Sequence, residues 1–73
     1  MYYIENGGVY RKEGKIFRSV SITVKEDRNG NIKSITVNPG KETVKDIKSK
    51  QTYTLDEIVR KFGVSEDNPI KAE

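Results

Sequence analysis

The fold is decided by residues 16–38, which read IFRSVSITVKEDRNGNIKSITVN. Apolar and polar residues alternate on both sides of Asn29-Gly30, a dipeptide that two-residue type I′ turns prefer because both central positions need positive φ. Two apolar pairs then face each other across the strands: Val24 with Ile35 and Ile22 with Val37. Since a slip of one residue would mix the two faces, turn and pattern together predict a long antiparallel hairpin.

Two more turns are predicted upstream of this hairpin. A turn at Asn6-Gly7 sets Ile4 opposite Val9, whereas a turn at Gly7-Gly8 would set Ile4 opposite Arg11, so we favour the first. A turn at Glu13-Gly14 follows, and Pro39-Gly40 is expected to end the last strand because proline cannot donate to a ladder. The result is an antiparallel meander over residues 2–5, 8–12, 15–26 and 31–38.

This register predicts one apolar face and one mixed face. Arg18 falls in the middle of the apolar face, which predicts a bulge or bend near Arg18-Ser19 as the sheet curls. The apolar face carries Ile4, Val9, Ile16, Val20, Ile22, Val24, Ile35 and Val37. We expect this face to form the core.

One helix is predicted after the sheet, over residues 54–62. Thr54 and Glu57 have the spacing of a capping box, and Gly63 suits the left-handed residue that ends a helix. The apolar stripe at helical spacing consists of Leu55, Ile58, Val59 and Phe62. A helix this short needs to dock on the sheet to persist.

The remaining segments give weaker signals. Residues 39–51 are expected to be irregular, with a helical turn or a short edge strand left open as alternatives, and residues 65–73 read as a flexible C-terminal tail. Residues 1–64 are then a single globular domain. The predicted fold class is small α+β: a curled, partly open, barrel-like meander of four or five strands with one C-terminal helix packed on it.

The segment Thr54-Leu55-Asp56-Glu57-Ile58-Val59-Arg60-Lys61-Phe62-Gly63-Val64-Ser65 resembles the first helix and turn of helix-turn-helix DNA-binding domains. In that family a second helix reads the bases. Here Glu66-Asp67-Asn68-Pro69 follows instead, so the resemblance implies a capped amphipathic helix and does not carry the family's function to this chain.

Composition excludes several kinds of chemistry. The 73 residues contain no His and no Cys, which excludes Ser-His-Asp and Cys-His catalysis and thiolate metal sites. We therefore expect no enzyme, no cofactor and no metal site. The absence of cysteine and of a long apolar run leads us to expect a cytoplasmic protein without membrane contact. The 14 basic and 11 acidic residues leave a net charge of +3, which still permits a polyanionic partner.

The clearest candidate binding residues lie on the mixed face. The predicted register places three aromatic residues in a row with cations beside them: Tyr3, Tyr10 and Phe17 with Lys12, Lys15 and Lys25. We rank burial of the rings first and a protein-binding patch second, since aromatic residues are enriched in both settings. A nucleic-acid face comes third, in which rings stack on bases and lysines contact phosphates.

The expected function is that of a small non-enzymatic binding module. We favour protein contacts, as in the accessory, inhibitor or adaptor proteins of bacteria and phages, because acids are interspersed among the bases. The alternative is nucleic-acid binding by the Tyr3, Tyr10 and Phe17 face. The unpaired outer strands also allow an edge-strand dimer in place of a monomer.

Overall fold

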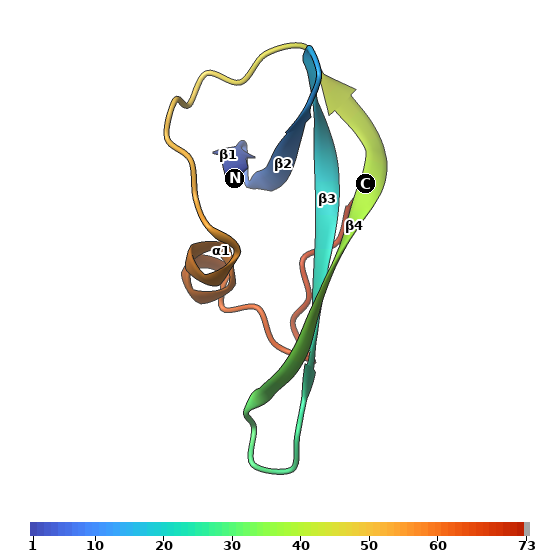
Figure 1. Cartoon of the computed structure of the whole chain (residues 1–73), viewed down its shortest axis with the longest axis vertical. Helices are drawn as coiled ribbons and strands as arrows, with labels where there is room; N and C mark the ends of the chain where they lie inside the picture. The colour runs from blue at the N-terminus through green and yellow to red at the C-terminus, as the bar shows by residue number, and fades with distance from the viewer. Residues whose placement is uncertain (73) are drawn as a thin grey trace.

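The computed structural model describes residues 1–72 and has four strands followed by one helix (Figure 1). The elements are β1 (Tyr2–Glu5), β2 (Gly8–Glu13), β3 (Ile16–Glu26), β4 (Ile32–Val44) and α1 (Leu55–Phe62). The strands form one antiparallel sheet in sequence order, β1-β2-β3-β4, which does not close into a barrel. The predicted α+β meander with a C-terminal helix is confirmed.

The β3–β4 hairpin has the predicted register but a different turn. Four pairs match the prediction: Ile22 with Val37, Thr23 with Thr36, Val24 with Ile35 and Lys25 with Ser34. The Asp27 N–H donates to the Asn31 carbonyl and the Gly30 N–H donates to the Asp27 carbonyl, and Gly30 alone in this loop has positive φ, +80°. The two-residue type I′ prediction is therefore wrong: the loop has three residues and ends on a left-handed glycine.

The side chain of Asp27 explains the longer turn. Its Oδ1 accepts the backbone N–H of Asn29 at 2.8 Å and that of Asn31 at 3.0 Å, which favours the wider loop. The longer loop shifts the pairing to Glu26 with Ile32, and a bulge between Lys25 and Glu26 absorbs the extra residue. Beyond the bulge the apolar pattern restores the predicted register.

The two upstream turns differ in outcome. The Asn6-Gly7 turn is confirmed: Ile4 pairs with Val9, and both turn residues have positive φ. The Glu13-Gly14 turn is wrong, because Glu13 pairs with Ile16 and the loop is Gly14-Lys15. Gly14, with φ of +61°, takes the first central position, which a type II′ turn reserves for glycine. The pairing shifts by two residues, so every side chain stays on its predicted face.

The end of β4 corrects a third prediction. Pro39 pairs with Val20, and the strand continues past Pro39-Gly40 to Val44. Proline is tolerated because β4 is the outer strand. The predicted bulge near Arg18-Ser19 is confirmed: opposite Ser19 alone on β3, β4 places the three residues 40–42.

The core lies between the predicted apolar face of the sheet and α1. The buried cluster joins Val9, Val20, Ile22 and Val24 to Ile58, Val59 and Val64. The capping box is confirmed, since Thr54 Oγ1 accepts the Glu57 N–H and Glu57 Oε1 accepts the Thr54 N–H. The predicted glycine cap is confirmed too: Gly63 is left-handed, and its N–H and that of Val64 bond to the last turn.

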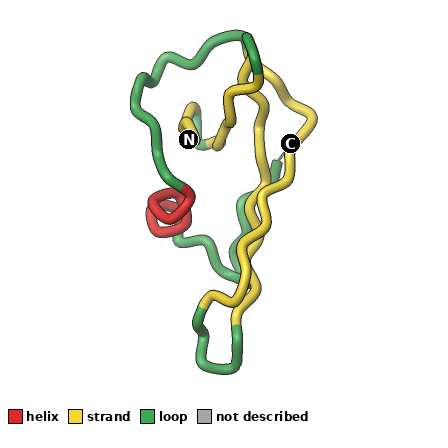
Figure 2. Tube along the Cα trace, viewed as in Figure 1, coloured by secondary structure: helices red, strands yellow, loops and turns green. Residues whose placement is uncertain are grey.

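Two irregular segments complete the structure (Figure 2). The coil between β4 and α1 crosses the end of the sheet, and its residue Tyr53 exchanges two backbone hydrogen bonds with Tyr2 of β1. The segment after α1 returns to the sheet, where Ile70 exchanges two backbone hydrogen bonds with Ile22 of β3. Glu66 and Ile70 thus have hydrogen-bond partners on β3, while the predicted flexibility of the tail stays a prediction and Glu73 lies outside the described residues.

Candidate functional site

The candidate site is built on the mixed face of the sheet, where two aromatic rings meet. Because the β2–β3 pairing is shifted by two residues, Phe17 stands opposite Lys12 and Tyr10 stands opposite Ser19. The predicted three-ring row is therefore wrong in register. Tyr3 nevertheless contacts Phe17 across β2, edge to face, with ring centroids 5.0 Å apart at 80°. Such pairs add roughly 0.5–1.5 kcal/mol beyond their buried area.

A short stretch of the coil, residues 45–50, covers part of this aromatic pair. Its anchor is Ile47, which is 2% exposed although it lies outside the main core cluster. The backbone N–H of Lys48 donates to Glu5 Oε2 of β1 at 2.8 Å, and Asp46 Oδ1 accepts the N–H of Ile47 at 2.9 Å. The buried Ile47 side chain and the Lys48–Glu5 hydrogen bond therefore hold the coil on the sheet, while the Asp46–Ile47 bond lies within the coil.

Between the coil and the sheet lies a cavity of about 510 Å³, which we name the lysine pocket. Its lining comes from β1, β2, β3, the Gly14-Lys15 turn and the coil. The lining residues are Tyr3, Lys12, Gly14, Lys15, Phe17, Lys45, Asp46, Ile47, Ser49 and Lys50. The volume falls within the ~300–1,000 Å³ typical of pockets that hold small ligands.

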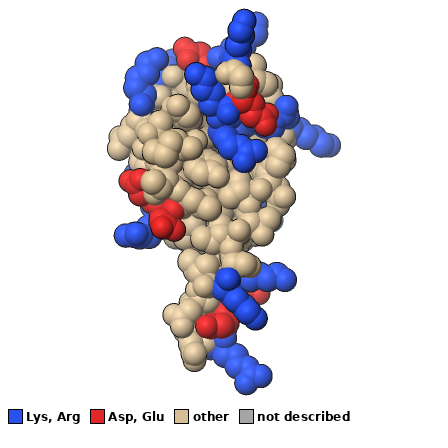
Figure 3. Space-filling model, in the orientation of Figure 1, with Lys and Arg blue, Asp and Glu red and all other residues tan. Residues whose placement is uncertain are grey.

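The charge of the lysine pocket is strongly one-sided. Of the described residues that line it, four are lysines and Asp46 is the single acid. Within residues 1–72 the ion pair that forms is Arg18 with Glu13, at 2.6 Å, and it involves no lysine of the pocket. Figure 3 shows basic side chains gathered at the end of the molecule that the coil crosses. Unpaired cations around an apolar floor are suited to an anionic ligand.

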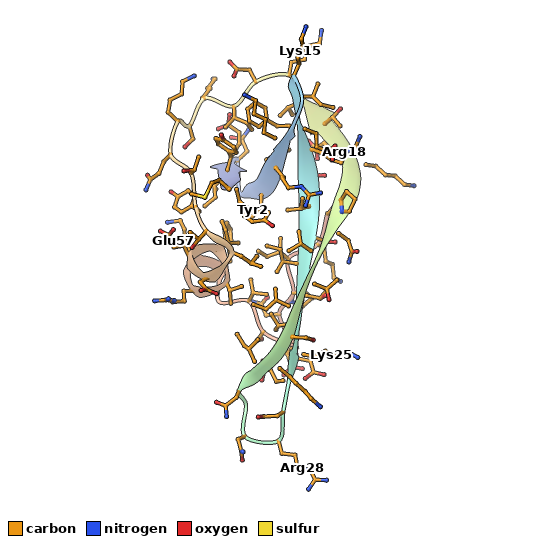
Figure 4. The ribbon with its side chains drawn as sticks, in the orientation of Figure 1. Tyr2, Lys15, Arg18, Lys25, Arg28 and Glu57 are labelled. Atoms are coloured by element: carbon orange, nitrogen blue, oxygen red, sulfur yellow. The ribbon has the colours of Figure 1, made fainter. Side chains whose placement is uncertain are left out.

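The structure brings together four of the six predicted site residues: Tyr3, Lys12, Lys15 and Phe17. Lys25 lies near the far end of the β3–β4 hairpin, away from Lys15 (Figure 4). Tyr10 is 7% exposed, so the expected burial holds for this ring, and its hydroxyl donates to Glu42 Oε1 at 3.3 Å.

Sequence reasoning missed the residues that the coil contributes. Lys45 and Lys50 double the positive charge of the pocket, and Ile47 holds them in place. The signal that was present in the sequence is one large apolar residue, Ile47, with lysines on both sides of it. Nothing in the pattern indicated which part of the sheet this segment would cover.

Tyr10 lines a second, smaller cavity of about 320 Å³, which lies between the Asn6-Gly7 turn and the C-terminal segment. The Ser19 hydroxyl at its wall is buried without a hydrogen-bond partner among the described residues. Gly40 packs directly against it: a Cβ on Gly40 would lie 2.5 Å from Ser19 Oγ and 2.5 Å from the Cβ of Ala72. Only glycine fits at this point of the β4 bulge.

The carboxylates with shifted pKa values lie outside the lysine pocket. The backbone N–H groups of Asn31 and then Asn29 hold the pKa of Asp27 below its usual value, and the Thr54 backbone N–H does the same for the pKa of Glu57. The pKa shift of Asp27 arises in the hairpin turn, and that of Glu57 arises in the helix cap. In the described part of the chain, no three Asp or Glu side chains are grouped so that they can hold a metal ion.

No family model, curated protein or solved structure matches this chain. Among residues 1–72, α1 is far too short to cross a membrane, and no other helix is present that can do so.

Proposed function

We propose that the protein is a non-enzymatic binding module and that its lysine pocket binds the backbone of a single-stranded nucleic acid. The observation that carries the proposal is the convergence of Lys12, Lys15, Lys45 and Lys50 around one cavity. The non-enzymatic part rests on the sequence, which has no His or Cys.

The composition of the pocket favours nucleic acid among anionic ligands. Proteins that bind single strands combine a positively charged groove with aromatic side chains that contact the bases. Tyr3 and Phe17 supply an apolar wall beneath the lysines, and the cavity is large enough for a small ligand such as one nucleotide unit. A single strand is favoured over a duplex because its unpaired bases can turn into a pocket.

An acidic protein segment is the second candidate ligand, and it keeps the protein-contact interpretation of the sequence. The favouring observation is that Ile47, Tyr3 and Phe17 give the same cavity an apolar part. A peptide with acidic and apolar side chains would complement both features.

The test is the affinity of the protein for a fluorescent single-stranded oligonucleotide, measured by anisotropy over a range of salt concentrations. With four phosphate contacts, log K should fall against log[salt] with a slope of about −2.8, since each contact contributes about −0.7. Lys45→Gln and Lys50→Gln should each weaken binding and reduce the slope by about 0.7. Lys33→Gln and Lys61→Gln are matched controls, because both lysines are exposed and lie outside the pocket.

Equal losses for pocket and control lysines would contradict the proposal, because diffuse charge would then explain binding. Absence of oligonucleotide binding, together with saturable binding of an acidic peptide that Lys45→Gln weakens, would establish the second candidate instead.

A further inference from the structure

The hydrogen bonds of Ile22 reveal which backbone groups of β4 are free. The N–H and the C=O of Ile22 both bond to Ile70, each at 2.9 Å. Ile22 and Val37 are therefore a non-hydrogen-bonded pair of the β3–β4 ladder. Bonded and non-bonded pairs alternate along an antiparallel ladder, so Thr23 with Thr36 is a bonded pair and Val24 with Ile35 is not.

It follows that the N–H and C=O groups of Ile35 and Val37 point away from β3. Among residues 1–72 no strand lies beyond β4 in the sheet, so these four groups form an open edge. Pro39 independently supports this assignment of the backbone groups that point away from β3. It is two residues beyond Val37, and its missing N–H would also have pointed outward, where the β3–β4 ladder does not need a donor.

We propose that this edge pairs with the same edge of a second copy of the chain, in a two-fold dimer centred on Thr36. In that register Ile35 of each copy stands opposite Val37 of the other, and all four free groups of each edge find partners. Thr36 faces Thr36, Ser34 faces Asn38 and Lys33 faces Pro39, so no like charges stand directly opposite each other.

Two features of the molecule favour a second copy as the occupant. Ile35 and Val37 are half-buried on the core face. In the dimer, Ile35 of each copy would be covered by Val37 of the other copy. The opposite edge of the sheet is already covered at Tyr2, whose N–H and C=O both bond to Tyr53. Pairing through β4 alone therefore closes at two copies and does not propagate into a fibre.

The variants for the experiment are chosen by their position relative to the two-fold axis, on which Thr36 lies. Thr36 is exposed, so Thr36→Lys leaves the monomer intact but sets two lysines directly opposite each other in the dimer. Thr23→Lys is the matched control: Thr23 is exposed, lies on the same face and pairs with Thr36, but it is one strand away from the axis. Thr36→Glu completes the set, since a mixture with Thr36→Lys restores opposite charges across the axis.

Sedimentation velocity from about 10 μM to about 1 mM protein should show a monomer–dimer equilibrium for the wild type and for Thr23→Lys. Thr36→Lys alone should remain monomeric, and its equimolar mixture with Thr36→Glu should dimerise. In the wild type, amide exchange at Ile35 and Val37 should slow as the concentration rises. The dimer is expected to be weak, because a short strand pairing buries less than the ~1,200 Å² of a stable interface.

A wild-type protein that stays monomeric to about 1 mM would overturn the proposal. So would a Thr36→Lys variant that dimerises as strongly as the wild type, or assembly beyond two copies. Oligonucleotide binding by Thr36→Lys should equal that of the wild type, so this result is independent of the lysine pocket.

Discussion

The two faces of one sheet are covered in very different ways. On the core face, α1 and the segment after it bury a continuous cluster around Ile22 and Ile58, both 0% exposed. On the opposite face, a coil anchored by Ile47 lies over two half-buried rings and leaves a lysine-lined cavity. The alternation of a β-strand separates the two faces residue by residue, so substitutions on the core face can change stability without altering the side chains that line the pocket.

The largest effect is expected at the centre of the core face. Ile22→Ala should lower the free energy of unfolding by ~2–5 kcal/mol, because it leaves a cavity among fully buried neighbours. In a small domain such a loss leaves much of the chain unfolded. Urea or thermal unfolding followed by circular dichroism measures it.

Thr23→Ala is the control for the same strand. Thr23 is exposed on the opposite face, and its truncation should change the free energy of unfolding by less than ~0.5 kcal/mol. Equal effects of the two substitutions would show that the core face is assigned wrongly.

Ile47→Ala tests whether Ile47 holds the coil of residues 45–50 in place over the lysine pocket. The free energy of unfolding should fall by ~2 kcal/mol, the low end for an isoleucine truncation, because Ile47 lies outside the main cluster. Amides of residues 45–50 should exchange faster, and oligonucleotide affinity should drop because Lys45 and Lys50 lose their positions. Ile32→Ala, at a side chain that is 49% exposed, should change neither quantity. If the Ile47→Ala variant keeps the oligonucleotide affinity of the wild type, the coil is not part of the binding site.

Thr54→Ala should have a smaller effect, confined to the core side. It removes the oxygen that accepts the Glu57 N–H at 3.3 Å, and loss of such a cap costs ~1 kcal/mol. Helical circular dichroism and the unfolding midpoint should decrease together, while oligonucleotide binding by the folded protein stays unchanged. Thr54→Ser keeps the acceptor and should retain most of the stability; a loss as large as that of Thr54→Ala would argue against the cap.

The smallest effect is expected from pH. Asp27 and Glu57 have folded pKa values below their ordinary values of 3.8 and 4.5, so each stabilises the fold above those values and stops doing so as the pH falls below them. The melting temperature should therefore decrease between about pH 5 and about pH 2. An Asp27→Asn, Glu57→Gln variant should show a shallower decrease; an equal slope would place the acid sensitivity elsewhere.

Much of the core face could be predicted from the sequence because pattern, turn chemistry and capping agree there. Ile22 and Val37 pair as predicted, and Thr54, Glu57 and Gly63 end the helix as predicted. The errors concern loops in which a local hydrogen bond competes with a turn preference. Asp27 accepts two backbone N–H groups and widens the Asn29-Gly30 turn, although the apolar pairs still restore the register.

The lysine pocket could be predicted only in part. Tyr3, Lys12, Lys15 and Phe17 share a strand face or an adjoining turn, and alternation is enough to group them. Lys45 and Lys50 reach the pocket through a coil whose path depends on Ile47 and on the Glu5–Lys48 hydrogen bond. No periodic pattern encodes such a contact between distant residues. Pro39 was likewise misread as a strand end because only the tertiary arrangement shows that β4 is an outer strand.

The most direct test of the proposed binding site is an amide NMR titration of the protein with a short single-stranded oligonucleotide, at low and at near-physiological salt. The lysine pocket predicts shifts clustered at Tyr3, Lys12, Phe17 and residues 45–50 that persist at the higher salt. Shifts spread over the surface that vanish with salt, or shifts centred on Lys25 and Arg28 at the hairpin end, would contradict it.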